Sequence, residues 1–184
     1  SILRNVYIVQ QINKLMSETI NLITNSKVTK KDFIFDFKEL YGHTEDWLKW
    51  RQFTVIESKY VEKVGPNGKS YEIHWITNRG IDAYSQYNVD IIWTITDMND
   101  IPAEIDGKKL ILQKGSINFD MSAYLTVDKE NKWENQPWMR LFKGFFDKFI
   151  YKSTMNRMKT ELWQISTELQ AEVKSFLELY RYNQ

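Results

Sequence analysis

The chain lacks cysteine, and only two of its 184 residues are histidine, three are proline and seven are glycine. The absence of cysteine excludes a disulfide scaffold, a thiolate metal site and a cysteine nucleophile. Two histidines are too few for a metal centre built on several imidazoles. So little glycine and proline also argues against collagen-like, linker-like and glycine-rich phosphate-binding sequences. Most motif-bearing enzyme classes are thereby disfavoured, and we expect no metal and no cofactor.

The charges are almost balanced, with 25 Lys and Arg against 24 Asp and Glu. This balance excludes a generally basic protein that wraps nucleic acid and an acidic solvating tail. Uncharged apolar runs are all shorter than the ~18 residues that span a bilayer. Aromatic residues make up 15% of the chain, which indicates a folded domain rather than disorder. A chain without cysteine fits a reducing cytoplasm, so we expect a cytoplasmic protein.

The N-terminal quarter carries two helix patterns around one short strand. Helical spacing of Val9, Ile12, Met16 and further apolar residues predicts an amphipathic helix over residues 1–26. Residues 33–37 are aromatic and predict a short strand. Residues 39–51 predict a broken helix, in which Thr44 caps the second piece. The remaining chain, residues 27–184, is expected to form a single domain.

Residues 53–127 predict an antiparallel sheet. Apolar and polar residues alternate in several short runs, most regularly from Ile117 to Val127. The turn sequence Gly65-Pro66-Asn67-Gly68 and the pair Asp106-Gly107 separate these runs. Since the runs follow one another without crossover helices, the sheet is a meander of about five to six strands. We therefore predict an α+β fold in which helices cover the sheet.

The C-terminal part, residues 137–181, predicts helices that begin at Pro137. Its second half carries an apolar stripe with steps of three and four residues: Met155, Met158, Leu162, Ile165, Leu169, Val173, Phe176 and Tyr180. Such a stripe packs on a sheet or on a partner helix. The second arrangement would make a homodimer.

Aromatic side chains of the predicted strands, together with the last helix, are candidates for an apolar ligand site. The candidate residues are Trp75, Trp93, Phe119, Tyr124 and Leu162. Ligand pockets are mostly apolar with a few polar groups, but a packed core has the same composition.

A basic and aromatic segment is the candidate interaction surface. Residues 129–159 contain eight basic and three acidic side chains. The candidate contact residues are Arg140, Lys143, Phe145, Lys148 and Phe149. This layout is typical of a helix at a membrane surface and also of a helix that covers a sheet. Nucleic acid is disfavoured, because the aromatic residues lie on the apolar face rather than between arginines.

His74 is the candidate for acid–base chemistry, because Glu72 or Asp90 could lie beside it in a sheet. A histidine satisfied by one hydrogen bond is the simpler interpretation, so we assign no catalytic residue. The carboxylates between Asp82 and Asp106 do not follow the spacing of a calcium loop. We interpret them as a solvated acidic edge.

Two resemblances follow from these patterns. The order of strand, broken helix, meander and long last helix is similar to helix-grip (START-like) domains, which hold apolar ligands between sheet and helix. The run Lys114 to Phe119, with Trp133-Glu134, Pro137 and residues 147–151, resembles uncharacterised archaeal proteins. The second resemblance implies no activity.

These observations favour a non-catalytic binding domain whose partner is an apolar small molecule or a protein. One alternative is a peripheral membrane or assembly component that docks through residues 138–152. Another is a hydrolase-like enzyme that uses His74.

Overall fold

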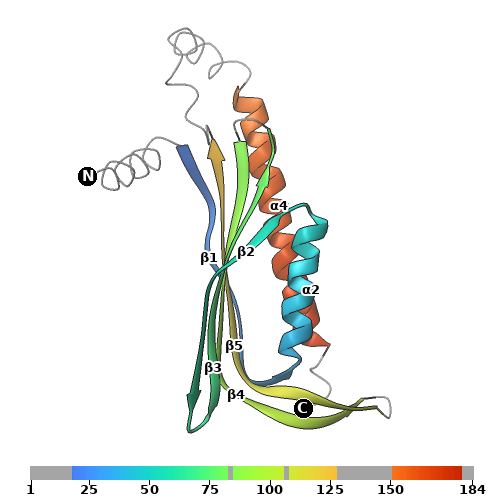
Figure 1. Cartoon of the computed structure of the whole chain (residues 1–184). Helices are drawn as coiled ribbons and strands as arrows, with labels where there is room; N and C mark the ends of the chain where they lie inside the picture. Colours follow the sequence, from blue (N-terminus) through green and yellow to red (C-terminus); the bar gives the residue numbers. More distant parts are fainter. Residues whose placement is uncertain (1–17, 83–84, 106–107, 128–150, 180–184) are drawn as a thin grey trace, which may run out of the picture.

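A computed structural model describes residues 18–82, 85–105, 108–127 and 151–179. These residues form a five-stranded antiparallel sheet with two helices, so the predicted α+β class is confirmed (Figure 1). The strands are β1 (Glu18–Phe35), β2 (Thr54–Gly65), β3 (Gly68–Gly80), β4 (Ser85–Ile105) and β5 (Lys108–Val127). The helices are α2 (Phe37–Trp50) and α4 (Tyr151–Glu178).

The sheet order is β1-β5-β4-β3-β2, so the first strand pairs with the last one. Strands β2 to β5 form the predicted meander. β1 pairs with β5 along its length, from Glu18 opposite Val127 to Phe35 opposite Gln113. Both helices lie on one face of the sheet, and α4 runs along the strands (Figure 1). The described elements leave the other face open.

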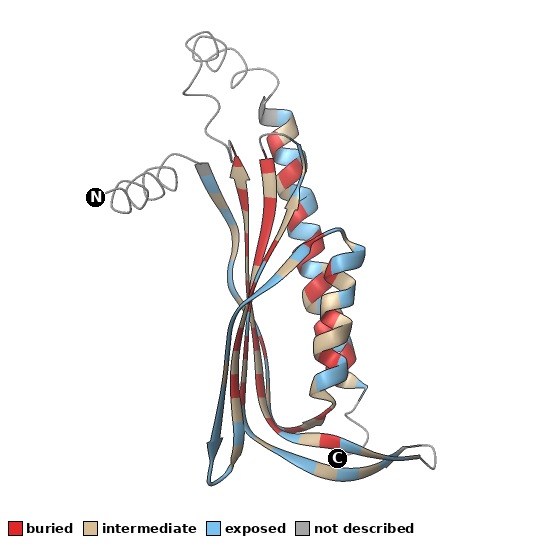
Figure 2. Ribbon diagram, viewed as in Figure 1, coloured by how far each residue is buried: buried red, intermediate tan, exposed pale blue. Residues whose placement is uncertain are grey.

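Strict alternation of residue types explains the core. On β4 and β5 the odd-numbered residues from Tyr87 to Ile95 and from Ile117 to Val127 are buried against the helices. Even-numbered neighbours such as Thr94 and Asn118 point to the open face. Figure 2 shows the resulting pattern, with buried residues on the inner side of the sheet and on the facing side of α4.

The predicted N-terminal helix is wrong where the structure describes it, because residues 18–26 belong to β1. Two register shifts, between Asn21 and Ile23 and between Ile23 and Ser26, interrupt the alternation of side chains. The apolar residues of this bulged strand therefore fall at a spacing that resembles a helix. Residues 1–17 lie outside the described residues.

The helix predicted as broken is continuous. Asp36, not Thr44, caps α2, since its carboxylate accepts a hydrogen bond from the Glu39 N–H at 2.9 Å. Thr44 is buried within the helix, where its hydroxyl donates to the Leu40 carbonyl at 2.8 Å. A threonine that bonds back to the preceding turn needs no helix end.

β4 and β5 are longer than expected and extend past their neighbours. β3 begins to pair with β4 at Lys69 opposite Met98, and β1 stops at Phe35 opposite Gln113. Residues 99–105 and 108–112 therefore continue as a two-stranded ribbon, which we call the arm. The arm bends beneath the ends of α2 and α4 (Figure 1).

Gly115 lies where this bend begins. A Cβ atom at this position would lie 2.9 Å from the Thr96 carbonyl oxygen and 3.0 Å from the Met98 Cα. The bulge between Thr96 and Asn99, with Asp97 at φ 53°, causes this close approach. Only glycine fits without moving the backbone.

Candidate functional site

The residues predicted to hold an apolar ligand form a solid core. Trp93, Phe119 and Leu162 are completely buried, and Trp75 is almost so. The ring centroids of Trp93 and Phe119 lie 4.8 Å apart, and those of Trp75 and Trp93 lie 5.9 Å apart. Rings at these distances are in direct contact and leave no room between them for a ligand.

Tyr124 does not belong to this group. It lies on the open face of the sheet, where its hydroxyl hydrogen-bonds an Asp90 carboxylate oxygen at 3.3 Å. The grouping of Tyr124 with Phe119 was wrong because residues five apart on a strand point to opposite faces.

One polar atom in the core has no partner. The indole N–H of Trp93 has no hydrogen-bond acceptor among the described residues. Two hollows that described residues line, of about 330 and 470 Å³, lie at the base of the arm. An unpaired donor in an apolar core is costly, and Trp93 lines neither of these two hollows.

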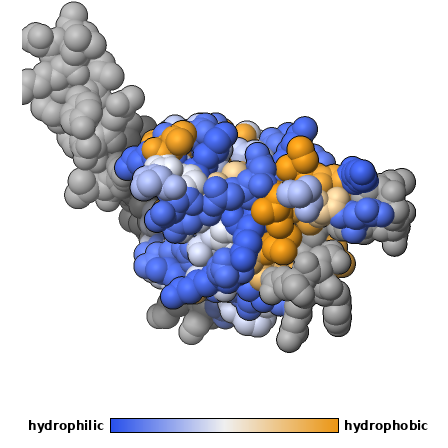
Figure 3. All heavy atoms as spheres, turned by 90° about the horizontal axis from the view of Figure 1, so that it is seen from below, coloured by the Kyte–Doolittle hydropathy of each residue, from blue (hydrophilic) through white to orange (hydrophobic). Residues whose placement is uncertain are grey.

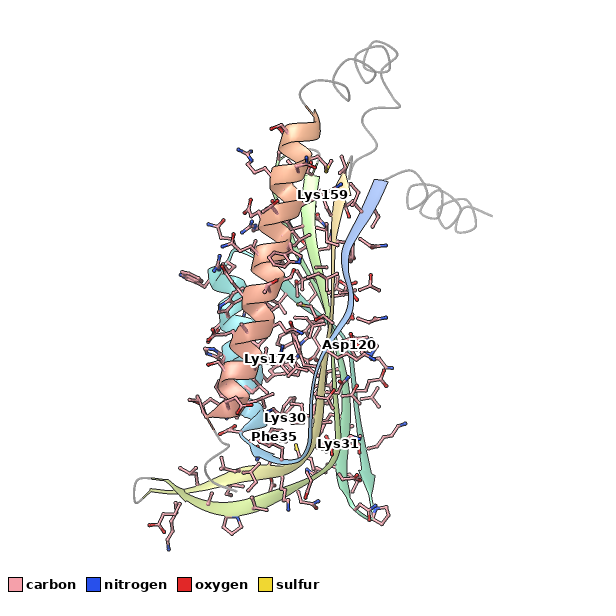
Figure 4. All side chains as sticks on the ribbon, turned by 180° about the vertical axis from the view of Figure 1, so that it is seen from behind. Lys30, Lys31, Phe35, Asp120, Lys159 and Lys174 are labelled. Atoms are coloured by element: carbon pink, nitrogen blue, oxygen red, sulfur yellow. The ribbon has the colours of Figure 1, made fainter. Side chains whose placement is uncertain are left out.

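α4 is fixed to the rest of the domain by polar contacts along both of its sides. On the side of α2 and β3, Glu161 accepts from Arg79 and Tyr87, Glu168 from Arg51, and Glu172 contacts His43 at 2.8 Å. On the side of β1, Gln170 donates to Ser26 and Lys30 to Glu178. Figure 4 shows Lys30 of β1 beside the lower part of α4 and Lys159 near its upper part.

The apolar stripe of α4 is already occupied. Met155, Met158, Leu162 and the rest of the stripe to Phe176 are buried. They pack against the chain's own sheet, so a homodimer through this stripe is not available to the folded domain. Two large apolar side chains are exposed on the outer side of the two helices, which we call the helical layer. They are Trp50 of α2, with 73% of its surface exposed, and Trp163 of α4, with 56%.

The His74 pair exists but lies in the open. His74 Nε2 lies 2.7 Å from Glu72 Oε1, on the uncovered face of the sheet. Lys59 donates to the same oxygen at 2.6 Å. The hydrogen bonds from Lys59 and His74 lower the pKa of Glu72. A carboxylate that is held ionised by a lysine and faces solvent is poorly suited to take up a proton.

Asp90, the other predicted partner of His74, lies elsewhere. It pairs with Ile76 of β3, whereas His74 pairs with Ile92 of β4. Burial raises the pKa of Asp90, and the hydrogen bond from Tyr124 opposes this effect. Burial and the neighbouring Asp90 raise the pKa of Tyr124 to about 12. The second carboxylate oxygen of Asp90 has no donor among the described residues.

Other predicted features are settled only in part. Arg140, Lys143, Phe145, Lys148 and Phe149 lie outside the described residues, so docking through residues 138–152 stays a prediction. Within the described residues no three His, Asp or Glu side chains are placed to hold a metal ion. No helix in this part of the chain has the length and apolarity to cross a membrane.

Sequence reasoning missed the arm, although Pro102 and the apolar residues around it were visible.

The comparisons add no relative: no protein-family model, curated protein or solved structure matches the chain. The function of the chain is therefore inferred from its own geometry.

Proposed function

We propose that this chain is a non-catalytic binding domain whose partner is a protein rather than an apolar small molecule. The observation that carries the proposal is the solid core under α4. Trp93, Phe119 and Leu162 fill the space in which a helix-grip domain would hold its ligand.

The element order supports a helix-grip arrangement without a gripped ligand. β1 pairs with β5, and α4 runs along the face that the five strands present to the helices. The ion pairs on both sides of α4 oppose its lifting from the sheet. A domain of this construction offers its partner a rigid outer surface.

The enzyme alternative has weaker support. His74 and Glu72 lie on an open sheet face, and neither lines the two hollows at the base of the arm. Catalytic pairs work best where surrounding groups exclude water and hold the substrate.

The helical layer offers contact residues of the kind that dominate protein interfaces. Trp50 and Trp163 project from α2 and α4, and the Arg51 guanidinium lies 5.0 Å from the Trp50 ring centroid. Tryptophan and arginine are enriched among residues that carry binding energy.

Mass spectrometry under gentle ionisation tests the proposal against a bound small molecule. We expect the mass of the chain, or a multiple of it, to agree with the mass in denaturing solvent. An additional small-molecule mass that disappears on denaturation would contradict the proposal. A photo-crosslinking residue in place of Trp163 then tests the helical layer, with the same residue at Thr96 on the open face as the matched control.

A further inference from the structure

The arm exposes two strand edges at the lower end of the molecule. Among the described residues, β5 has no neighbouring strand beyond Gln113 on the side of β1, and β4 has none beyond Met98 on the side of β3. Unpaired edges present free N–H and C=O groups, which invite another strand. Figure 3 shows hydrophobic side chains gathered toward the arm at this end, on a surface that is otherwise mainly hydrophilic.

Three of the four free edges of the described sheet are protected. β1 has three register shifts and exposed lysines such as Lys27 and Lys31. β2 has a register shift between Glu57 and Lys59 and carries exposed charges along its length. In the arm, β4 carries Pro102, which cannot donate to an added strand.

Of these features, the arm edge of β5 has only an exposed lysine, Lys109. Its register against β4 is regular from Lys108 to Lys114, and it contains no proline. Leu110 is half-buried, Leu112 is buried, and Ile111 is 66% exposed. Lys109 is the one charged side chain described between residues 109 and 113. This edge is therefore the least protected in the described structure.

Pro102 also indicates which backbone groups of β5 are free. A proline is tolerated opposite another strand where its nitrogen faces away from that strand. Ile111 is the residue opposite Pro102. In an antiparallel pair both members of such a position direct their N–H and C=O outward. We infer that Ile111, and Lys109 two residues away, direct these groups toward the open edge.

We propose that this edge pairs with the same edge of a second copy, in an antiparallel register centred on Leu110. This register places Lys109 opposite the Ile111 of the second copy, and the reverse. Both residues have outward backbone groups, so the two pairs form four hydrogen bonds. Leu110 then packs against the Leu110 of the second copy. The aliphatic part of each Lys109 side chain covers the exposed Ile111 opposite it.

The two neighbouring registers are excluded on specific grounds. A register centred on Lys109 brings two lysines directly opposite each other, which is destabilising. A register centred on Ile111 requires space opposite Gln113 and Lys114, where Phe35 and Ile34 of β1 already lie. Of these three registers, the one centred on Leu110 uses all of the free edge without repulsion. A twofold contact of this kind closes on itself.

This contact is separate from the helical layer, so the inference goes beyond the proposed function and is tested separately. Two strands of about five residues bury less area than a standard stable interface, which predicts a weak dimer. Light scattering on the full chain, from about 10 to 500 µM, should show the weight-average mass rising from 22.1 kDa toward twice that value.

The decisive variant is Ile111→Lys, which places two lysine pairs across the contact. We expect it to raise the dimer dissociation constant at least about tenfold. Ile56→Lys is the matched control, because Ile56 is also an exposed strand isoleucine but lies on β2. The control should keep the wild-type dissociation constant. Ile111→Pro removes the outward N–H and should abolish dimerisation while the far-ultraviolet circular dichroism stays unchanged.

Hydrogen exchange provides a readout that does not depend on mass. The amides of Lys109 and Ile111 should exchange more slowly at high protein concentration, and those of β2 should not. A wild-type chain that stays monomeric up to 500 µM overturns the proposal. A dimer that Ile111→Lys leaves unchanged also overturns it, although the proposed protein-binding function would stand. A bound small molecule would instead contradict the proposed function alone.

Discussion

Replacing Leu162 by alanine is the sharpest test of the solid core. Leu162 lies on α4 and has no exposed surface. Truncating a buried leucine removes its transfer free energy and leaves a cavity, which together cost about 2–5 kcal/mol. For a domain of this size each kcal/mol lowers the melting temperature by roughly 2–4 °C. We therefore expect a decrease of about 6–12 °C for a mid-range cost near 3 kcal/mol.

The matched control is Leu179→Ala, just after the last residue of α4. Leu179 is 68% exposed, so its truncation should change the free energy of unfolding by less than about 0.5 kcal/mol. Urea unfolding of both variants, followed by tryptophan fluorescence and circular dichroism, measures the two values. Equal losses in the two variants, or a loss below about 1 kcal/mol for Leu162→Ala, would refute the packing argument.

A comparison of Leu162→Ala with the wild-type chain tests whether a ligand site lies under α4. The cavity of Leu162→Ala would be apolar and dry, and such cavities bind benzene. Benzene should therefore raise the melting temperature of Leu162→Ala and leave the wild-type chain unchanged. Stabilisation of the wild-type chain by benzene would mean that a pocket already exists between the sheet and α4.

Three further predictions concern other parts of the fold. Gly115→Ala should destabilise the fold by about 1–3 kcal/mol, because its Cβ would meet the backbone of β4. Gly42→Ala should stabilise it by about 0.5–1 kcal/mol, because Gly42 lies within α2 with open space around it. Thermal unfolding should show a lower melting temperature for the first variant and a higher one for the second. Glu161→Ala should cost about 1–3 kcal/mol, because it leaves the buried Tyr87 hydroxyl without its 2.9 Å acceptor, and a double-mutant cycle with Tyr87→Phe should recover much of this loss. Burial raises the pKa of Asp90 in the folded state, so its contribution to stability is present below the unfolded pKa and is lost as the pH rises through the folded pKa. Asp90→Asn should therefore have a higher melting temperature than wild type at pH 7, and this difference should shrink toward pH 3; a constant difference would contradict the burial of Asp90.

The meander could be predicted from the sequence because its alternation is regular. From Ile117 to Val127 every odd-numbered residue is buried, as the pattern requires. β1 could not be predicted in the same way, since bulges after Asn21 and Ile23 change which residues face the core. Bulges depend on the partner strand, which lies about a hundred residues away and is invisible to a local pattern.

The candidate site was predictable only where strand geometry alone decides it. The contact between Glu72 and His74 follows from their positions two apart on one strand. Whether that face is covered depends on how the layers stack, so the sequence could not place the pair in solvent. Tyr124 could have been separated from Phe119 by the same alternation rule. The core aromatic residues look alike as a ligand site and as a packed interior until their ring distances are known.

The pairing of the first strand with the last one sets an order of events during synthesis. Asn25 and Ser122, which share a hydrogen bond across β1 and β5, are 97 positions apart. At about 5–20 residues per second, the ribosome needs roughly 5–20 s to make the chain between them. During that time β2, β3 and β4 are synthesised, and β1 has not yet met β5, the strand with which it pairs. Exposed lysines such as Lys27 and Lys31 disfavour pairing of β1 with another strand, so they protect the nascent chain as well as the edge of the finished sheet.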